Sequence, residues 1–262
     1  MLTLTDESTG TEVSDGVVLD VSTCGTGPTA LLLPGVEGAR ADQEFAAQLG
    51  ADHTVLAPSH PGFDHSARPD WLDTVEDLAY LYLDYLDRID ARDVTLVGCQ
   101  FGGWVAAEMA VRSTARLSRL VLVDAVGIKP GGREDRNIAD VFHMTRAELD
   151  RRTFHDVAKG PGDLSAAAQD DVELIARNEE ALACFGWDPY LYNPRLLRWL
   201  HRVSVPTLIA WGESDGIVTA DYGRAYAAAI PGARFEVIPE AGHRPQVEQP
   251  ARLGALIRDF AG

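Results

Sequence analysis

The chain has 262 residues, which suits one large domain or one domain with an insertion. It carries 23 Lys and Arg against 40 Asp and Glu, so its formal net charge is −17 at pH 7. Nucleic acids and anionic membranes bind basic surfaces. We therefore expect no nucleic-acid partner and no membrane partner.

Three scattered cysteines, Cys24, Cys99 and Cys184, form neither a disulfide framework nor a metal-binding spacing. The segment Met1–Gly16 is acidic and polar, unlike a signal peptide, and no apolar run approaches the roughly 18 residues of a membrane span. We expect a cytoplasmic protein with reduced thiols. No metal site and no glycine-rich phosphate loop is indicated, so no cofactor is expected.

Short apolar runs recur along the chain and predict strands. Most central runs are apolar at every position, as expected for strands whose two faces are buried. The predicted strands span Gly16–Ser22, Thr29–Leu33, His53–Ala57, Val94–Gly98, Arg119–Asp124, Thr207–Gly212 and Ala233–Ile238.

Amphipathic stretches at 73–89, 102–112 and 250–260 predict helices between or after these strands. The first has Asp73 or Thr74 as its N-cap. Alternation of strands and helices predicts an α/β fold with a mostly parallel central sheet flanked by helices. The face of the first helix that we expect to be buried carries Val75, Leu78, Ala79, Leu86 and Ile89.

No strand signal appears from about Val126 to Val203, where helical patterns dominate. Strand signals resume directly afterwards. We therefore interpret residues 126–203 as a helical cap inserted into a core formed by residues 1–125 and 204–262; a separate helical domain is the alternative. The helical stretches predicted here are 133–144, 146–158, 165–185 and 194–203.

The stretch LVGCQFGGW, Leu96–Trp104, has the frame of a nucleophile elbow. In such an elbow, a Gly-x-Ser-x-Gly turn between a strand and a helix exposes a serine. Here Gly98 ends the strand-like run, Gly102 and Gly103 open the helical pattern, and Gln100 stands at the central position. A glutamine side chain cannot attack a carbonyl carbon.

Five motifs occur in the order found in the α/β-hydrolase fold family, which the chain resembles over essentially its full length. Each motif alone is weak evidence, but five in order are specific. The motifs are LLLPGVEG (31–38), HPGFDHSARPDW (60–71), LVGCQFGGW (96–104), WGESDGIV (211–218) and PEAGHRPQVEQP (239–250).

This resemblance implies a catalytic acid at Asp215 and a catalytic base at His243. A histidine base needs a carboxylate behind it to fix its tautomer. Both residues follow predicted strands, so both are expected at the carboxyl edge of the sheet, where ligands bind. The resemblance also implies an oxyanion site made by the backbone N–H of Phe101 and a donor of the earlier loop, for which we take Val36.

Several residues depart from the family pattern or allow two interpretations. Pro34 stands where the family usually has histidine, and Glu37 adds a carboxylate that faces either the oxyanion site or solvent. Asp124, at the end of another strand, is either an alternative acid for His243 or a cap of the following turn. Cys99 lies one position before the elbow residue, and we expect it to be buried rather than nucleophilic.

The combination of Gln100, Asp215 and His243 predicts an enzyme that forms no acyl-enzyme. The Gln100 amide would hold a water or a substrate oxygen near His243, which would act as a general base. The reaction would be that of a lyase, isomerase, cyclase or decarboxylase, or a direct addition of water. Two alternatives stay open: a serine hydrolase (esterase or C–C hydrolase) carrying a serine-to-glutamine change, and a ligand-binding pseudoenzyme.

Aromatic residues in the predicted cap favour a small apolar or aromatic substrate. Packing against the core explains them equally well. His143 and His155 are further candidates for cap side chains facing the pocket, and a homodimer is left open. The aromatic residues are Phe142, Phe154, Phe185, Trp187, Tyr190 and Tyr192.

Overall fold

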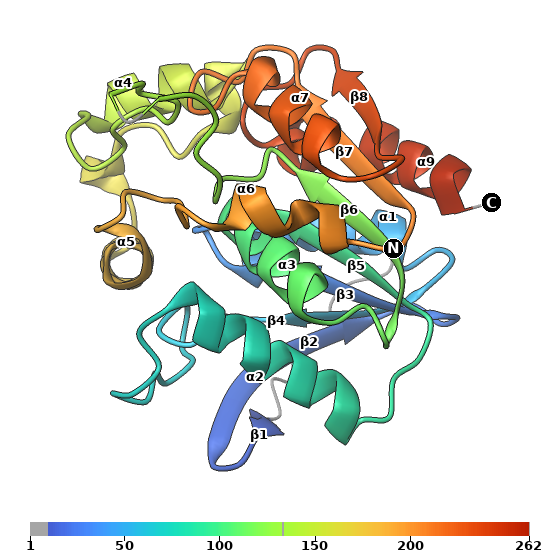
Figure 1. The fold of residues 1–262 in the computed structure, drawn as a ribbon. Coiled ribbons are helices and arrows are strands. Elements are labelled where there is room, and N and C mark those ends of the chain that lie inside the picture. Colours follow the sequence, from blue (N-terminus) through green and yellow to red (C-terminus); the bar gives the residue numbers. More distant parts are fainter. Residues whose placement is uncertain (1–9, 133, 262) are drawn as a thin grey trace.

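An eight-stranded sheet forms the centre of the computed structural model, which describes residues 10–132 and 134–261 (Figure 1). The strand order is β1-β2-β4-β3-β5-β6-β7-β8. Strands β3 to β8 run parallel, whereas β1 and β2 pair antiparallel at one edge. The predicted mostly parallel sheet flanked by helices is therefore confirmed. The strands are β1 (Gly10–Ser14), β2 (Val17–Cys24), β3 (Thr29–Leu33), β4 (Thr54–Pro58), β5 (Val94–Cys99), β6 (Leu117–Val123), β7 (Thr207–Gly212) and β8 (Arg234–Ile238).

Helices cover both faces of this sheet (Figure 1). One face packs against α2, α3 and α7, and the other against α1 and α9. The helices are α1 (Gln43–Leu49), α2 (Val75–Arg88), α3 (Gln100–Arg112), α4 (Arg146–Thr153), α5 (Gln169–Gly186), α6 (Leu196–Trp199), α7 (Ala220–Ala229), α8 (Pro245–Glu248) and α9 (Pro250–Ala261), with 3-10 turns at Ala39–Asp42, Val157–Lys159, Leu164–Ala166 and Leu200–Arg202.

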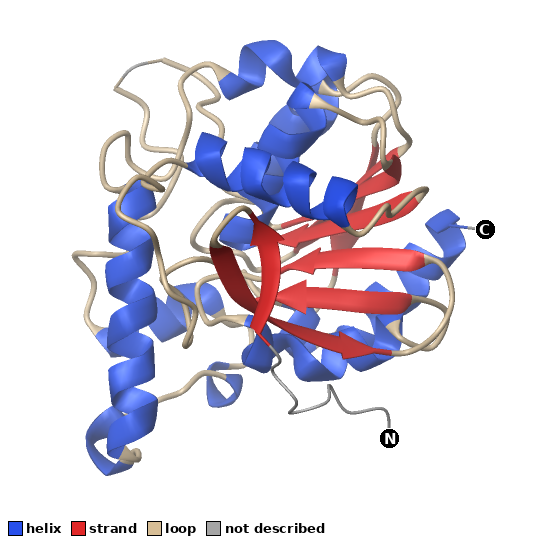
Figure 2. Ribbon diagram, turned by 90° about the horizontal axis from the view of Figure 1, so that it is seen from below, coloured by secondary structure: helices blue, strands red, loops and turns tan. Residues whose placement is uncertain are grey.

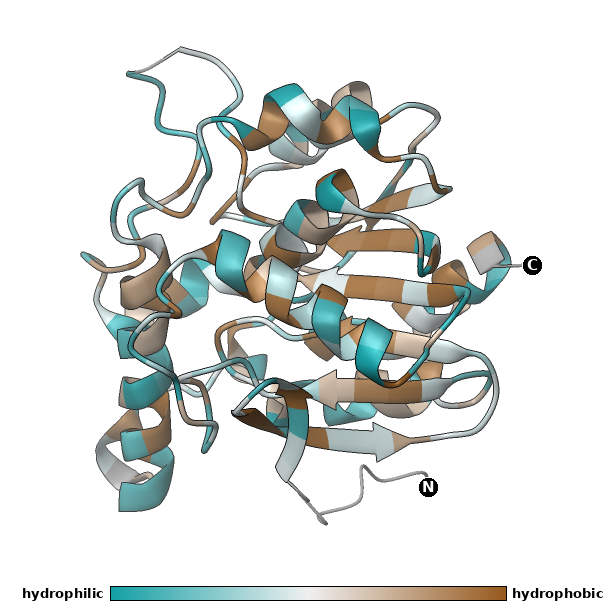
Figure 3. Ribbon diagram, turned by 60° about the horizontal axis from the view of Figure 1, so that its bottom comes forward, coloured by the Kyte–Doolittle hydropathy of each residue, from teal (hydrophilic) through white to brown (hydrophobic). Residues whose placement is uncertain are grey.

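The core consists of two apolar layers separated by the sheet. Successive side chains of a strand point to opposite faces, so Leu31 and Leu33 of β3 join the layer beneath α2 and α3. Ala30 and Leu32 join the layer beneath α1 and α9. Figure 3 shows hydrophobic residues along the central strands. Burial on both faces explains why these strands read as continuous apolar runs.

Helix α2 begins as predicted. Thr74 is its N-cap, and the Thr74 side chain accepts a hydrogen bond from the backbone N–H of Asp77 at 3.1 Å. Val75, Leu78 and the other expected core residues of this helix are buried, but Ile89 is 41% exposed. The prediction for Ile89 was wrong because the helix ends at Arg88, and Ile89 leaves the buried stripe at its C-cap.

Between β6 and β7 the described residues form helices α4 to α6 and no strand. The helix expected at 133–144 is wrong over 134–144, and Arg133 lies outside the described residues. Ala139 donates its N–H to the Ile217 carbonyl, and Val141 donates to the Tyr190 hydroxyl, so tertiary hydrogen bonds replace helical ones there. The division of the chain into core and cap stays a prediction.

The parallel strands deliver their carboxyl ends to one edge of the sheet. Figure 2 shows the arrowheads of these strands pointing toward the long helix of the segment between β6 and β7, which stands beyond the strand ends. Gln100, Asp124 and Asp215 each follow a parallel strand within three residues. Within the described part of the chain, no helix is both long and apolar enough to cross a membrane.

Candidate active site

Strand β5 passes directly into helix α3 at Gln100. This residue has φ of 47°, in the left-handed region that non-glycine residues rarely adopt. The turn needs close backbone approach on both sides: a Cβ on Gly102 would lie 2.2 Å from the Leu33 carbonyl oxygen, and one on Gly98 would lie 2.5 Å from the Gly102 carbonyl oxygen. The two glycines therefore permit the sharp turn that presents residue 100 at the sheet edge.

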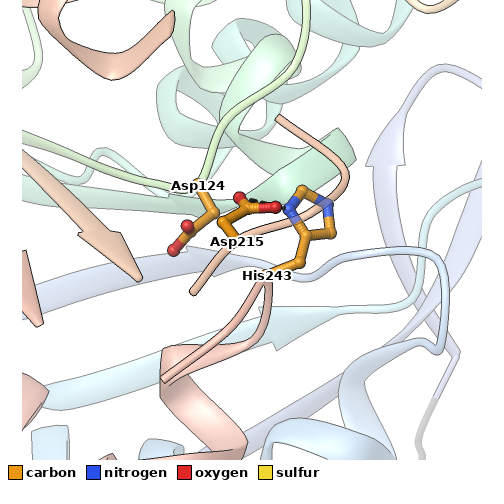
Figure 4. Close-up of side chains that lie close together, drawn as sticks. All are labelled: Asp124, Asp215 and His243. Atoms are coloured by element: carbon orange, nitrogen blue, oxygen red, sulfur yellow. Dashed lines mark hydrogen bonds and ion pairs between the residues drawn. The ribbon is translucent and has the colours of Figure 1, made fainter. Parts of the chain in front are cut away.

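His243 and Asp215 form a buried pair on the loops after β8 and β7. The His243 Nδ1 atom lies 2.8 Å from Asp215 Oδ2, and Figure 4 shows the carboxylate pointing at the ring. The other Asp215 oxygen, Oδ1, accepts the N–H groups of Ile217 and Val218 at 2.8 and 3.0 Å. These bonds fix the carboxylate, which in turn holds a proton on Nδ1 and leaves Nε2 as the free, basic nitrogen.

Asp124 lies on the far side of Asp215 from the imidazole, with its carboxylate turned away from the ring (Figure 4). Its Oδ1 accepts the Gly212 N–H at 2.9 Å. Burial, followed by the charge of Asp215, raises the pKa of Asp124 well above 3.8, which favours the neutral form of this carboxyl. The alternative of Asp124 as the acid partner of His243 is wrong, because Asp215 occupies Nδ1.

Asp124, Asp215 and His243 bring three potential metal ligands within 4.8 Å of one another. Nδ1 of the histidine and both oxygens of Asp215 are already engaged in hydrogen bonds. A metal ion here would have to break the pair that orients the ring. The cluster therefore fits a hydrogen-bonded acid–base group better than a metal centre.

Both amide hydrogens of Gln100 are used inside the protein. Gln100 Nε2 donates to the His243 carbonyl oxygen at 2.8 Å and to Gln246 Oε1 at 3.1 Å. Gln246 Nε2 donates back to Gln100 Oε1 at 2.9 Å. A carboxamide nitrogen has only two hydrogens. The Gln100 amide therefore has no hydrogen left to donate to a water or substrate oxygen, and the expectation that it does so is wrong.

Glu37 lines the cavity next to His243, but it is paired. Its Oε1 lies 3.2 Å from Arg244 Nη1, and the guanidinium also lies 3.9 Å from buried Asp42. The cation offsets the negative charge that Glu37 would otherwise bring to an oxyanion site. Val36 and Phe101 also line the cavity, and the Phe101 N–H lies in the first turn of α3, where helical N–H groups lack intrahelical partners.

A cavity of about 650 Å³ lies above these groups. Its walls come from the sheet-edge loops and from the segment between β6 and β7, and Gln100 and His243 lie among the lining residues. Of the predicted aromatic residues, Phe142 and Phe154 line it, but the other four do not. Phe185 packs in the core instead, and Trp187 is 65% exposed. The main apolar lining residues are Val36, Phe101, Val126, Val141, Phe142, Met144, Leu149, Phe154, Pro161, Leu174, Ile175, Leu182, Leu191, Ile217 and Val247.

Neither His143 nor His155 lines this cavity. The His155 Nδ1 atom instead lies 2.9 Å from the hydroxyl of Ser214, the residue directly before Asp215. The prediction that these two histidines face the pocket was wrong. A short chain segment turns His155 to the outer side, and sequence patterns in irregular segments carry no information about such orientation.

Residues 30–256 match the family model described as "Alpha/beta hydrolase family". The chain belongs to the alpha/beta hydrolase family. Among curated relatives, it is 27% identical over 248 residues to a 2-hydroxymuconate semialdehyde hydrolase of Pseudomonas sp. (strain CF600), covering 81% of this chain and 78% of that protein. It is 28% identical over 260 residues to the dihydrolipoyllysine-residue acetyltransferase component of the acetoin cleaving system of Cupriavidus necator, covering 95% and 67%.

Solved structures support the alpha/beta hydrolase fold. The 2-hydroxy-6-oxo-6-phenylhexa-2,4-dienoate hydrolase from Rhodococcus sp. strain RHA1 superposes with a TM-score of 0.79 at 19% identity, covering 100% of this chain and 99% of that one. The meta-cleavage product hydrolase CumD from Pseudomonas fluorescens IP01 gives 0.75 at 21% identity, covering 95% and 96%. At such identities the likeness concerns the fold alone.

Sequence reasoning missed Gln246, Arg244 and Asp42 in this alpha/beta hydrolase. Gln246 and Arg244 sit in the histidine motif, but nothing in that motif says which of its polar residues turn inward. Asp42 lies in a helical turn that was not predicted, and it is 2% exposed. A buried carboxylate of this kind has no sequence signal, because aspartate is mostly a surface residue.

Asp42 gives this alpha/beta hydrolase a pH-dependent stability term. Burial raises the pKa of Asp42 from 3.8 to about 7, although Arg244 lowers it. Because the folded-state pKa is the higher one, this contribution to stability is full below about pH 4 and is lost as the pH rises through about 7. Asparagine does not titrate. As the pH rises from about 4 to above 7, we therefore expect the unfolding free energy of Asp42→Asn to increase relative to that of the wild type by up to about 4 kcal/mol.

Urea unfolding of both proteins at about pH 4, 6 and 8 measures this difference. Asp70→Asn is the matched control, since Asp70 is exposed and its variant should follow the wild type at each pH. A gap between the Asp42 variant and the wild type that does not change with pH would contradict the assignment.

Proposed function

We propose that this protein is an enzyme in which Gln100 takes the place of the family's serine nucleophile and His243 acts as a general base. Asp215 orients and stabilises the histidine, and no acyl-enzyme forms. The observation that carries the proposal is the paired His243 ring, whose Nδ1 is held by Asp215 at 2.8 Å while the ring lines the cavity. That arrangement prepares Nε2 to take a proton from a bound molecule.

The described lining residues offer no good substitute for a serine nucleophile. They include neither serine nor cysteine, and Thr153 supplies their only hydroxyl. The Thr153 carbonyl accepts the His243 backbone N–H. Among the described residues, the Thr153 hydroxyl makes no hydrogen bond to the His243 ring, which a nucleophile activated by this base would need. Cys99 is fully buried, and burial raises the pKa of its thiol well above 9.0. It cannot supply a thiolate.

The rate enhancement that is lost without a serine nucleophile favours chemistry that needs no covalent intermediate. Loss of a serine nucleophile costs about 10⁶-fold in turnover of a serine hydrolase. A positioned general base contributes about 10²- to 10⁴-fold by itself. The general base alone can provide this enhancement in a lyase, isomerase, cyclase or decarboxylase reaction, or in a direct addition of water. Ester hydrolysis through an acyl-enzyme also needs the nucleophile.

The substrate is proposed to be small and apolar or aromatic, because apolar side chains make up most of the cavity wall. Residues 126–203 are proposed to act as a cap, since Phe142, Leu174 and Leu182 of this segment line the same cavity as His243. The names of two similar proteins, a 2-hydroxymuconate semialdehyde hydrolase and a phenylhexadienoate hydrolase, point to C–C bond hydrolysis as the form of direct water addition to test first.

In that reaction the substrate's dienol would first become its keto tautomer, its hydroxyl proton moving to the carbon next to the carbonyl group that water attacks. His243 Nε2 would then take a proton from water while the hydroxide oxygen bonds to that carbonyl carbon. The carbon–carbon bond would break with its electrons moving into a conjugated dienolate, which takes the proton back from the imidazolium. All atoms balance without a bond to residue 100. Backbone N–H groups at Phe101 and Val36 would stabilise the oxyanion formed on the way.

A panel assay tests the proposal. Purified protein is incubated with 2-hydroxymuconate semialdehyde, with aryl ketones and aldehydes in D₂O, and with 4-nitrophenyl acetate. We expect conversion or deuterium exchange of a carbonyl compound that depends on His243, and no burst with the ester. Saturable binding of panel compounds without any His243-dependent reaction would contradict the proposal and favour a ligand-binding protein.

The variant Gln100→Ser tests the serine hydrolase alternative. In Gln100→Ser, a site that differs from an esterase only at residue 100 would gain strong ester hydrolysis and react with a serine-directed fluorophosphonate. We expect little gain, because Gln100 is bonded to Gln246 and to the His243 backbone, which a serine side chain is too short to replace.

A further inference from the structure

We propose that Gln100 and Gln246 are positioning residues, whose paired amides hold the backbone of His243 in place for catalysis. Gln100 thus acts through the histidine rather than by donating to the substrate. This inference rests on the proposed role of His243 as the base. It assigns a role to Gln246, which lies in helix α8 directly after the histidine.

The two amides bond to each other in both directions. Gln100 donates to Gln246 at 3.1 Å, and Gln246 donates back at 2.9 Å. The second hydrogen of Gln100 Nε2 then reaches the His243 carbonyl oxygen at 2.8 Å. The reciprocal pair fixes which way the Gln100 amide faces, so that its nitrogen and not its oxygen meets the carbonyl.

Burial gives this orientation its energetic weight. Gln100 is 5% and Gln246 is 1% exposed. A rotated Gln100 amide would place its oxygen against the His243 carbonyl oxygen, and both buried atoms would then lack a donor, which is energetically costly. The surrounding chain also leaves room for the pair: a Cβ on Gly35 would lie only 2.5 Å from Gln100 Oε1. Glycine at position 35 therefore suits a long side chain at position 100.

The Gln100 bond completes a three-point attachment of His243. The backbone N–H of the histidine donates to the Thr153 carbonyl at 2.6 Å, and its Nδ1 is held by Asp215 at 2.8 Å. The carbonyl oxygen is the remaining polar group of the residue besides Nε2. With Gln100 bonded to that oxygen, only Nε2 stays available for a substrate.

Gln246 allows the role to be tested without touching the substrate, because it does not line the cavity. In Gln246→Met the side chain keeps its length but loses both amide bonds, and the Gln100 amide is free to rotate. Misplacement of a catalytic group by about 1 Å costs up to about 100-fold in rate. We expect kcat on the fastest-converted panel compound to fall about 10- to 100-fold with KM unchanged.

A second readout needs no substrate. The ring nitrogens of His243 are followed by ¹⁵N NMR during a pH titration of the ligand-free protein, assigned by comparison with His243→Ala. We expect the His243 titration curve of Gln246→Met to shift from that of the wild type, because the ring no longer holds one position against Asp215. Gln249→Met is the matched control: Gln249 lies three residues further on, and its side chain bonds to the Glu240 carbonyl rather than to Gln100 or His243.

The outcomes separate the two proposals. A folded Gln246→Met with wild-type kcat and an unchanged His243 titration overturns the positioning role. If His243→Ala itself keeps full turnover, the proposed function fails, while the NMR titration still decides whether the amide pair positions the ring. Should Gln246→Met not fold, Gln246→Ala, which leaves room for a water molecule beside Gln100, is expected to show the same shift and the same loss.

Discussion

Replacing His243 by alanine is expected to lower turnover of the fastest-converted carbonyl compound by about 10²- to 10⁴-fold, the contribution of a positioned general base. Affinity for that compound should change little, because the walls that bind it are mostly apolar residues elsewhere in the cavity. Steady-state kinetics and equilibrium binding of the same compound measure the two quantities.

His155→Ala is the matched control for this loss. His155 lies outside the cavity and contacts Ser214, the residue before Asp215. The Asp215 carboxylate is held separately by the N–H groups of Ile217 and Val218, so loss of His155 leaves the His243 ring in place. We expect it to retain turnover within about threefold, as for a residue that does not touch the reacting atoms. Equal turnover in the wild type and in His243→Ala would remove the histidine from the mechanism.

The second large effect is expected for Asp215→Asn. Two backbone N–H groups point at Asp215 Oδ1, so an amide placed there turns its oxygen toward them and its NH₂ group toward His243 Nδ1. That Nδ1 must then accept, which places the ring proton on Nε2 and removes the base. Turnover should fall about 10²- to 10⁴-fold without loss of folding, as measured by kinetics and circular dichroism.

Asp124→Asn is the paired variant that distinguishes the two buried carboxyls. Asp124 Oδ1 accepts the Gly212 N–H, which an amide oxygen also does, and the His243 ring is bonded to Asp215 rather than to Asp124. We expect it to lose less than about tenfold in turnover. The reverse order of losses, large at 124 and small at 215, would assign the acid to β6 instead of β7.

The sheet and the Asp215–His243 pair were predictable because their signals are local. Apolar runs mark β5 and β7, and a glycine frame marks the turn at Gln100, so residues at strand ends could be assigned to one edge of the sheet. The outlying strand β1 was missed because Val13 is the single large apolar side chain among its five residues, so it shows no apolar run. Helices α1 and α7 were missed because they are only 7 and 10 residues long, too short for a repeated apolar period.

What the sequence did not reveal is the set of bonds made across the chain. Gln100 and Gln246 are 146 positions apart, and their pairing depends on how α8 docks beside α3. The same holds for Arg244, which lies between Glu37 and Asp42. Polar residues of this kind carry no periodic pattern, so their inward orientation follows from tertiary packing rather than from local preference.

Chemical rescue tests the central claim most directly. Alanine at position 243 leaves a space in the cavity wall beside Asp215 that a free imidazole molecule can enter. Imidazole added to His243→Ala is predicted to restore part of the lost turnover in a saturable manner, increasing as more of the imidazole is unprotonated. A variant that loses turnover but gains nothing from imidazole at any concentration or pH would contradict the assignment of His243 as the base.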